Sequence, residues 1–332
     1  MNVSMPQSRA HRTLSIGGAT FDLFAQTKFP MKNLEIGSKI PVKDVIEACG
    51  GGAANSSVGL SRLGCQAGFA GIIGSDQWGE KLLKNFQTEH VDTSSATIVD
   101  GEITSFSIII SVSGGDRIIL YTSGANKHLH DSTFDREHAA GMDWIYLNRL
   151  HEDSCEIQDD LILMLCNLNG PGLTWNPGGC QIEQGADHLA NRGLLAQTDI
   201  LLMNKEEALA FGHVASTDEA HRLFHSMGVG ISCITDSKNG ATAFDGKNIY
   251  HCPVLAQNAI VDTTGAGDAF GVGMTWALLN KMDLPNCLRA GTINATSVIS
   301  SVGAETGLLT DILMRKQLEA TRLDVTTRSV LS

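Results

Sequence analysis

The cysteines of this sequence lack the spacing that metal sites and disulfide frameworks require. The chain has 8 cysteines in 332 residues, and no two of them form a C-x-x-C pair. A zinc site normally needs closely spaced ligand pairs, and a disulfide-stabilised domain is short and dense in cysteine. We therefore expect reduced thiols, which are typical of cytoplasmic proteins.

Positive charge and long apolar runs are also scarce. The formal net charge is −12, with 24 Lys and Arg against 36 Asp and Glu, and no Lys/Arg cluster stands out. A nucleic-acid-binding surface needs such a cluster, so we expect no nucleic-acid partner. No apolar run approaches the length of a membrane span, and residues 1–12 lack the apolar core of a signal peptide. We expect a cytoplasmic protein without a membrane partner.

Several common catalytic and nucleotide-binding motifs are missing. The sequence contains no G-x-S-x-G and no G-x-x-x-x-G-K-[ST], which argues against a serine hydrolase and a Walker-type nucleotide site. The Gly17-Gly18 turn does not fit the dinucleotide pattern G-x-G-x-x-G. His221 and His225 lie one helical turn apart, but the glutamate of H-E-x-x-H is absent, so we expect a solvated helix face there.

Strand-like and helix-like segments alternate between residues 143 and 203. This alternation predicts an α/β fold with a mainly parallel central sheet flanked by helices. A first strand is expected over residues 13–22, with Asp22 just beyond its carboxyl end. Because ligands of open α/β sheets bind at that edge, Asp22 is a candidate for binding a polyhydroxylated ligand; an ordinary turn aspartate is the alternative.

Two further segments favour short strands outside the main sheet. Residues 23–47 contain two prolines and no sustained helical period, and residues 103–110 and 117–121 form a hairpin pattern around the turn 113–116. Together they predict a small antiparallel sheet, built from about 22–48 and 101–122, that covers a cleft as a lid.

The most informative stretch is DTTGAGDAF at residues 262–270, where a Gly-rich turn opens a helix. The N–H groups of a first helical turn have no intrahelical partner, and the helix dipole adds positive charge, so an anion such as phosphate is the natural ligand. Asp268 would then lie beside that anion. This arrangement makes sense if Asp268 accepts a proton from a hydroxyl that attacks the phosphate, although a dipole-matched aspartate in a plain turn is the alternative.

A second Gly-rich turn, GGGAAN at residues 50–55, precedes a short helix that Gly64 is expected to end. Asn55 offers a donor and an acceptor to a ligand hydroxyl. Farther on, Asn204 and Glu207 lie three residues apart at a helix start. They suit either Mg²⁺ held largely through water or a capping box, and the sequence leaves both interpretations open.

These motifs together resemble the ribokinase/PfkB carbohydrate kinase family. Residues 262–270 are similar to its C-terminal signature, residues 50–55 to its N-terminal signature, and Asn204 with Glu207 to its N-x-x-E element. The likeness covers about residues 14–309. It implies a ribokinase-like, Rossmann-like α/β fold with a small β-sheet lid, and ATP-dependent phosphorylation of a hydroxymethyl group.

The resemblance also implies roles for single residues. Asp268 would be the general base, and the N–H groups of Gly265, Ala266 and Gly267 the anion hole. Asn204 and Glu207 would organise Mg²⁺ and its waters around ATP, with Thr235, Gly240 and Asn294 near the nucleotide. The acceptor side would be formed by Asp22, Gly51, Gly52 and Asn55. Asp262 and Thr264 match residues that bind a potassium ion in some members.

One departure from the family motifs bears on the acceptor. Gly52 stands where the ribokinase motif has lysine, so ribose is not a safe expectation. With 3 Tyr and 4 Trp in the chain, we favour a sugar or sugar derivative over a nucleoside, which would call for a more aromatic wall. A nucleoside kinase of the same family and a non-catalytic sugar- or nucleotide-binding homologue remain alternatives.

We expect one kinase domain over residues 13–310, followed by a C-terminal extension over residues 311–332 that is amphipathic at first and then irregular. Exposed lid strands have unpaired edges, which invite pairing between two copies. A homodimer formed through the lid strands is therefore a further expectation, next to the small-molecule sugar or nucleoside as the main binding partner.

Overall fold

The computed structural model describes residues 10–27, 37, 39–112, 117–131, 134–150, 155–166, 170–256 and 260–330. Within these residues the main sheet has nine strands in the order β15-β14-β13-β12-β11-β10-β9-β1-β4. Neighbouring strands from β4 to β12 pair in parallel, and β13, β14 and β15 continue the sheet in antiparallel fashion. The strands are β1 (Arg12–Ile16), β4 (Gln66–Ala70), β9 (Trp144–Leu147), β10 (Gly172–Trp175), β11 (Ile200–Asn204), β12 (Ile231–Thr235), β13 (Ala241–Phe244), β14 (Asn248–Cys252) and β15 (Thr326–Ser329).

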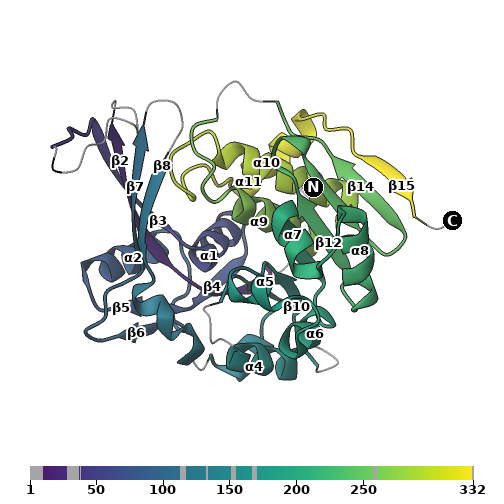
Figure 1. Ribbon diagram of the computed structural model, residues 1–332, viewed down its shortest axis with the longest axis horizontal. Coiled ribbons are helices and arrows are strands. Elements are labelled where there is room, and N and C mark those ends of the chain that lie inside the picture. The colour runs from purple at the N-terminus through teal and green to yellow at the C-terminus, as the bar shows by residue number, and fades with distance from the viewer. Residues whose placement is uncertain are drawn as a thin grey trace, which may run out of the picture.

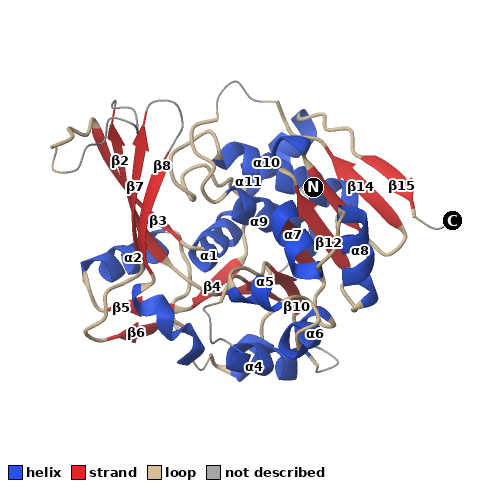
Figure 2. Cartoon of the chain, in the orientation of Figure 1, coloured by secondary structure: helices blue, strands red, loops and turns tan. Residues whose placement is uncertain are grey.

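Helices cover both faces of this sheet, because successive residues of each buried strand point to opposite sides. On β11, Leu201 packs with the cluster that includes helices α4 to α8, whereas Leu202 packs with α9 and α10. Figure 2 shows these two layers of helices around the strands. The helices of the two layers are α4 (Cys155–Leu165), α5 (Cys180–Gln184), α6 (Leu189–Leu195), α7 (Lys205–Gly212) and α8 (Thr217–Ser226), and then α1 (Gly52–Arg62), α9 (Ala266–Leu279), α10 (Leu284–Val298) and α11 (Asp311–Ala320).

A four-stranded sheet of order β3-β2-β7-β8 stands apart from the main sheet, at the left of Figure 1. Its strands are β2 (Thr20–Thr27), β3 (Asp44–Gly50), β7 (Phe106–Val112) and β8 (Arg117–Thr122). This sheet, called the lid below, has the predicted hairpin β7–β8, but β2 and β7 pair in parallel, so the expectation of a purely antiparallel lid is wrong. The lid segments at 28–36, 38 and 113–116 lie outside the described residues.

The first strand is shorter than predicted. β1 ends at Ile16, and the chain turns at Gly17, whose φ is 141°, before β2 begins at Thr20. Asp22 therefore lies inside a lid strand and not just beyond the carboxyl end of the first core strand. The break cannot be recognised in the sequence, because β1 and β2 are both apolar. Gly17 and Gly18 between them therefore suggest the end of one strand and not a turn between two.

Most of the remaining described elements lie in the connections between the two sheets. They are β5 (Ile72–Gly74) paired with β6 (Thr97–Val99), helix α2 (Gln77–Thr88), a 3-10 helix at Gly124–Asp131 and helix α3 (Arg136–Ala140). A further 3-10 helix at Ser237–Asn239 joins β12 to β13 within the main sheet. Phe21 of the lid stacks on Trp78 of α2 with ring centroids 4.8 Å apart, and Trp78 stacks on Phe106 at 5.0 Å. These stacks hold the base of the lid against α2.

The C-terminal residues are not irregular. After α11, which buries Met314 completely, β15 pairs with β14 and forms one edge of the main sheet. Figure 1 shows β15 at the right, beside β14. Among the described residues, no helix combines the length and the apolar character needed to cross a bilayer.

His221 is buried, so the expected solvated helix face is wrong for this residue. It lies on α8 with no exposed surface, and its ring nitrogens are 2.7 Å from Ser232 Oγ and 3.0 Å from Thr242 Oγ1. Burial lowers the pKa of His221 from 6.5 to about 4, because the charged imidazolium loses its hydration. The polar residues of α8 in the sequence suggested an exposed helix, but the face that carries His221 packs on β12 and β13.

The buried His221 predicts a loss of stability in acid. Its folded pKa of about 4 is below the unfolded value of 6.5, so the unfolded state takes up the proton first. The stabilisation is full above pH 6.5 and is lost as the pH falls toward 4. Between pH 6.5 and pH 4, the free energy of unfolding of wild type should fall by on the order of 3 kcal/mol more than that of His221→Gln. Urea unfolding at several pH values measures this difference. Parallel pH profiles of the two proteins would contradict this assignment.

Candidate active site

The predicted anion-binding turn lies at the start of α9. Gly265 caps the helix in the left-handed region with φ 75°, and it lies against Ala304 so closely that a side chain there would clash with Ala304. Around Gly267, in contrast, a side chain would meet no atom within 4 Å. The first helical turn, residues 265–268, is therefore open at Gly267, and its backbone geometry suits an anion.

Asp268 lies in this first turn and is held by a residue of the second Gly-rich motif. Asn55 Nδ2 donates a hydrogen bond of 2.7 Å to Asp268 Oδ2. Burial raises the pKa of Asp268 to about 6, with a smaller contribution from the negative charge of Glu207, and the Asn55 hydrogen bond opposes this rise. A carboxylate with such a pKa can accept a proton near neutral pH and release it again.

Asn55 has a further, unused polar atom. Its side chain is only 4% exposed, and its Oδ1 has no hydrogen-bond partner in the structure. Buried polar atoms are rarely left unpaired, so Oδ1 is available to a ligand hydroxyl beside Asp268. Asn55 can therefore both orient the Asp268 carboxylate and bind a ligand. The sequence analysis indicated only the ligand-binding role.

The glycines before α1 allow three loops to approach one another. Gly51 has φ 95°, and a side chain at this position would come within 2.6 Å of the Gly18 carbonyl oxygen. At Gly52 a side chain would lie 2.8 Å from Asn148 Oδ1. The N-terminus of α1 thus lies directly beside the chain that follows β1 and β9, as is expected of a ligand site at the carboxyl edge of the sheet.

Asn148 is a candidate that the sequence did not identify. It follows β9, is 2% exposed, and its Nδ2 donates to Ser56 Oγ at 2.9 Å, whereas its Oδ1 has no partner. Like Asn55, it presents a buried acceptor atom next to Gly52. Its place directly after a core strand was the available signal, but without the fold nothing distinguished Asn148 from its neighbours.

Asp22 reaches the same region from the lid. It is 7% exposed, it accepts a hydrogen bond from Ser107, and it lies so near Gly50 that a side chain there would come within 2.6 Å of Asp22 Oδ2. Burial raises the pKa of Asp22 to about 6, the Ser107 hydrogen bond lowers it, and the charge of Asp262 adds to the rise. Asp22 thus lies on a lid strand beside the glycine motif, with which the family resemblance groups it.

Asn204 and Glu207 form the capping box of α7. Asn204 Oδ1 accepts from Glu207 N at 2.8 Å, and Glu207 Oε2 accepts from Asn204 N at 3.0 Å. Burial raises the pKa of Glu207, and hydrogen bonds from Asn204 and the charge of Arg149 oppose this. The capping interpretation is therefore confirmed. It leaves Glu207 Oε1 outside the box as the atom that could hold Mg²⁺ through water.

Two of the predicted nucleotide residues lie at the same edge of the sheet. Thr235, the last residue of β12, is paired in register with Asn204, the last residue of β11. Gly240 closes the turn after β12 with φ 86° and packs against the carbonyl group of Cys252, so only glycine fits there. Lys205 and Asp236 form an ion pair of 2.9 Å that bridges the ends of these strands.

Asn294 cannot contact a nucleotide, and its assignment as a binding residue is wrong. It has no exposed surface on α10, its Nδ2 donates to Ala269 O at 2.8 Å, and its Oδ1 accepts from Leu309 N at 3.1 Å. Both ends of the amide are thus used inside the protein. Asn294 instead fixes α9 and the segment after α10 relative to α10.

The predicted cation residues, Asp262 and Thr264, lie together but are engaged with protein donors. Asp262 Oδ1 accepts from Thr264 N at 3.0 Å and from Thr264 Oγ1 at 2.8 Å, and Asp262 Oδ2 accepts from Gly303 N at 3.1 Å. Arg117 of the lid donates to Asp262 Oδ1 at 3.0 Å. These bonds tie the start of the anion-binding turn to two distant segments.

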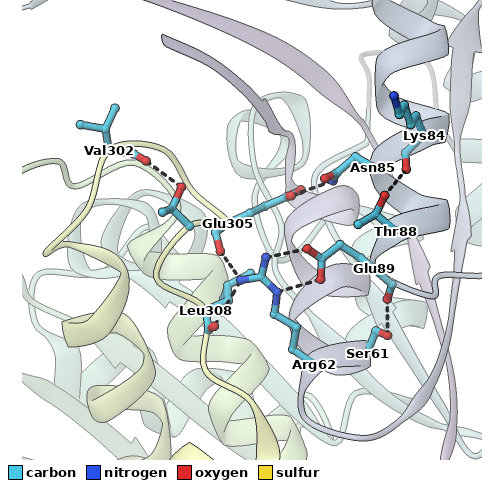
Figure 3. A network of polar contacts seen from close by, with 10 residues as sticks. Ser61, Arg62, Lys84, Asn85, Thr88, Glu89, Val302, Glu305 and Leu308 are labelled. Atoms are coloured by element: carbon cyan, nitrogen blue, oxygen red, sulfur yellow. Dashed lines mark hydrogen bonds and ion pairs between the residues drawn. The ribbon is translucent and has the colours of Figure 1, made fainter.

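A polar network centred on Arg62 joins three segments of the chain (Figure 3). Arg62 Nε and Nη2 donate to the two carboxylate oxygens of Glu89 at 2.8 and 2.7 Å. Arg62 Nη1 donates to the carbonyl oxygens of Glu305 and Leu308 at 2.6 and 3.2 Å. Because Ala304 packs on Gly265, this network positions the segment against which the turn rests. It joins α1, α2 and the segment after α10, and no local sequence pattern could have revealed it.

Arg149 adds a cation at the same edge. Its side chain lies over the turn at Gly178 and Gly179, where a side chain would come within 3.1 and 2.7 Å of it respectively. It is exposed, and its charge lowers the pKa of Glu207. Arg149 therefore brings positive charge close to Glu207 at the start of α7. The sequence contained no pattern that marked it.

Comparison with known proteins adds a family match. The family described as pfkB family carbohydrate kinase matches residues 11–311. Ribokinase from Haemophilus influenzae is 29% identical over 271 residues, which are 79% of this chain and 85% of that protein. The structure of Arabidopsis thaliana ribokinase complexed with ribose and ATP superposes with a TM-score of 0.79 at 20% identity, covering 93% of this chain and 99% of that one. The structure of Burkholderia thailandensis nucleoside kinase in complex with inosine superposes with a TM-score of 0.77 at 18% identity, covering 93% of this chain and 98% of that one.

The contacts of Asp268 predict opposite effects of two substitutions on its pKa. Asn55→Ala removes the hydrogen bond that favours the carboxylate, so the pKa of Asp268 rises above about 6, by roughly one unit. Glu207→Gln removes a nearby negative charge, so the pKa falls. Carboxyl ¹³C NMR titration measures both shifts, with Asp268→Asn identifying the resonance. Shifts of the same sign in the two variants would contradict the geometry.

Proposed function

The chain belongs to the pfkB family of carbohydrate kinases and is a phosphotransferase, and we propose that it transfers the γ-phosphate of ATP to a hydroxymethyl group of a sugar or sugar derivative. The observation that carries this proposal is the arrangement of Asp268. It lies in the first turn of α9, held by Asn55 at 2.7 Å, with a pKa raised to about 6.

In the proposed reaction Asp268 acts as general base. Its carboxylate takes the proton of the acceptor hydroxyl, the oxygen attacks the γ-phosphorus, and the bond to the β,γ-bridging oxygen breaks, so that ADP leaves. The N–H groups of Gly265, Ala266 and Gly267 neutralise the charge on the transferred group, which is the main task of a protein in phosphoryl transfer. Because Asp268 is partly desolvated, it is a better proton acceptor than an exposed carboxylate.

The acceptor would lie between the lid and α1. Asp22, the backbone of Gly51 and Gly52, and the unpaired Oδ1 atom of Asn55 converge there and suit several hydroxyl groups. Such a set of acceptor atoms favours a polyhydroxylated ligand, because each unpaired buried oxygen is satisfied only by a donor. This is what supports a sugar as the substrate.

ATP would lie along the carboxyl ends of β11 and β12, near Thr235 and the Gly240 turn. Bound Mg²⁺ would supply positive charge that offsets the negative charge of the phosphates. Glu207 Oε1 is the side-chain atom that could hold the ion's water, because the capping box uses Oε2 of Glu207 and Oδ1 of Asn204. Asn294 has no part in this proposal.

A nucleoside acceptor is the second candidate, and one feature of the lid favours it. Tyr121 is 60% exposed and pairs in register with Ser107, which itself pairs with Asp22. Cross-strand neighbours in register share one face of a sheet. The tyrosine ring is thus presented on the same lid face as Asp22, where it could stack on a base.

Turnover on an acceptor panel tests the proposal. We expect ADP release from ATP and Mg²⁺ with a pentose, hexose, sugar acid, sugar phosphate or nucleoside, and Asp268→Asn should lower kcat by at least about 100-fold. Asp311→Asn, a partly exposed acid on α11, is the matched control and should behave as wild type. Normal turnover in Asp268→Asn would refute the base. Acceptor binding without any turnover in wild type would support a non-catalytic binding protein instead.

Exposed apolar residues on the lid lead us to propose a homodimer. Val45, Ile119 and Leu120 are 56%, 51% and 53% exposed on β3 and β8, the two edge strands of the lid. Pairing of two copies would cover these side chains and the unpaired strand edges. We expect light scattering to give about twice the chain mass of 35.4 kDa. Leu120→Asp should yield the monomer, whereas Ile312→Asp, on exposed α11, should not; a monomeric wild type at working concentration would refute the dimer.

A further inference from the structure

Arg117 connects the lid to the anion-binding turn. It is the first residue of β8, and its Nη1 donates to Asp262 Oδ1 at 3.0 Å and lies 3.2 Å from Thr264 Oγ1. The arginine side chain is 38% exposed, but the side chain of Asp262 is only 8% exposed. The ion pair is therefore shielded on the carboxylate side, where solvent screening is weaker than at an open surface.

The two residues predicted to bind a monovalent cation do not fit one in this structure. Asp262 Oδ1 accepts from Thr264 N, from Thr264 Oγ1 and from Arg117, and Oδ2 accepts from Gly303 N. Three of these four donors lie on Oδ1, which has two lone pairs, so this oxygen offers no free position to a cation. A metal cation at this position would also face the guanidinium charge across a short distance, which is repulsive.

The contacts around Asp262 all favour its negatively charged form. The backbone N–H groups of Thr264 and Gly303, the Thr264 hydroxyl and the Arg117 guanidinium all donate to its two oxygens. A permanent, largely buried charge needs a permanent partner, and arginine, which does not lose its proton in proteins, meets this requirement.

This ion pair acts on the turn that is proposed to bind phosphate. Asp262 precedes Gly265 by three residues, and its contacts hold Thr264, directly before the helix cap, and Gly303, directly before the Ala304 on which Gly265 packs. A change at Asp262 therefore displaces both sides of the turn. In Figure 1, β8 belongs to the lid at the left and α9 to the central helices, so the contact of Arg117 with Asp262 links two separate parts of the fold.

We propose that Arg117 supplies, from the lid, the positive charge that braces the anion-binding turn, so that phosphoryl transfer by this protein needs no monovalent cation. This inference rests on the proposed function, because it assigns Arg117 as a positioning residue for the turn that would hold the transferred phosphate. Arg117 itself touches neither Asp268 nor, in this proposal, the reacting atoms. Its contribution is to the geometry of residues 262–265.

The first test compares salts of different cations. At equal ionic strength, kcat of wild type in KCl and in tetramethylammonium chloride should agree. In tetramethylammonium chloride, kcat of Arg117→Gln should be about 10-fold or more below that of wild type, because a charged hydrogen bond is gone. In KCl this variant should recover part of the lost kcat, because K⁺ can then reach Asp262. Arg117→Lys, which keeps the charge, should stay close to wild type in both salts.

Lys43→Gln is the matched control. Lys43 directly precedes lid strand β3; its side chain is 57% exposed and pairs with Asp44 at the surface. Its removal takes an equal charge from the neighbourhood of the lid without touching Asp262, so we expect wild-type behaviour in both salts. A cation response in Lys43→Gln would indicate a general charge effect of the lid and would overturn the role assigned to Arg117.

A second readout needs no acceptor. K⁺ should leave the thermal unfolding midpoint of wild type unchanged relative to tetramethylammonium, and should raise that of Arg117→Gln, since K⁺ then binds the folded state. Stabilisation and activation of wild type by K⁺ would overturn the inference, as would an Arg117→Gln variant that responds to no cation. If no acceptor were turned over, the proposed kinase activity would fail, and the unfolding midpoints would still decide whether Arg117 takes the cation's place.

Discussion

The hydrogen bond from Asn55 to Asp268 is the interaction on which the candidate site depends. A carboxylate at the N-terminus of a helix is stable in the free protein, because the helix dipole favours it. The same carboxylate becomes a repulsive neighbour when a phosphate enters the turn. Asn55 holds the group by its Oδ2 at 2.7 Å and thereby opposes the effect of burial and of Glu207 on the pKa of Asp268, which is about 6 as the net result. The balance leaves an ionised base that is ready to take a proton.

The glycines of the two motifs make this contact possible. Gly51 lets α1 begin against the backbone of Gly18, and Gly265 lets α9 begin against Ala304, so that the two helix N-termini meet with Asn55 facing Asp268. Neither glycine can be replaced without strain, since both have positive φ. Around them, Arg62 fixes the segment after α10, and Arg117 holds Asp262. The site is thus rigid on the side of the base and the anion-binding turn.

The parts of the fold that the sequence predicted well are those with strong local patterns. The strand from Ile200 and the helix after it, the hairpin through Phe106, and the two Gly-rich helix starts all carry their signal within a few residues. Asp22 was assigned to the wrong strand because two apolar strands follow each other across Gly17. Asn294 was misjudged for another reason. A buried asparagine and a ligand-binding one look alike in a sequence, and only its bonds to Ala269 and Leu309 distinguish them.

The sequence by itself determined the fold class, the two glycine turns and the identity of the candidate base, because backbone conformation, helix start and residue type are properties of short segments. Only the tertiary structure decided which side chains serve those turns. Asn55 and Asp268 are 213 residues apart, Arg62 and Glu305 are 243 apart, and Arg117 and Asp262 are 145 apart. Such pairs are selected by packing of distant segments, which brings hydrogen-bonding groups together at distances that no local periodicity encodes.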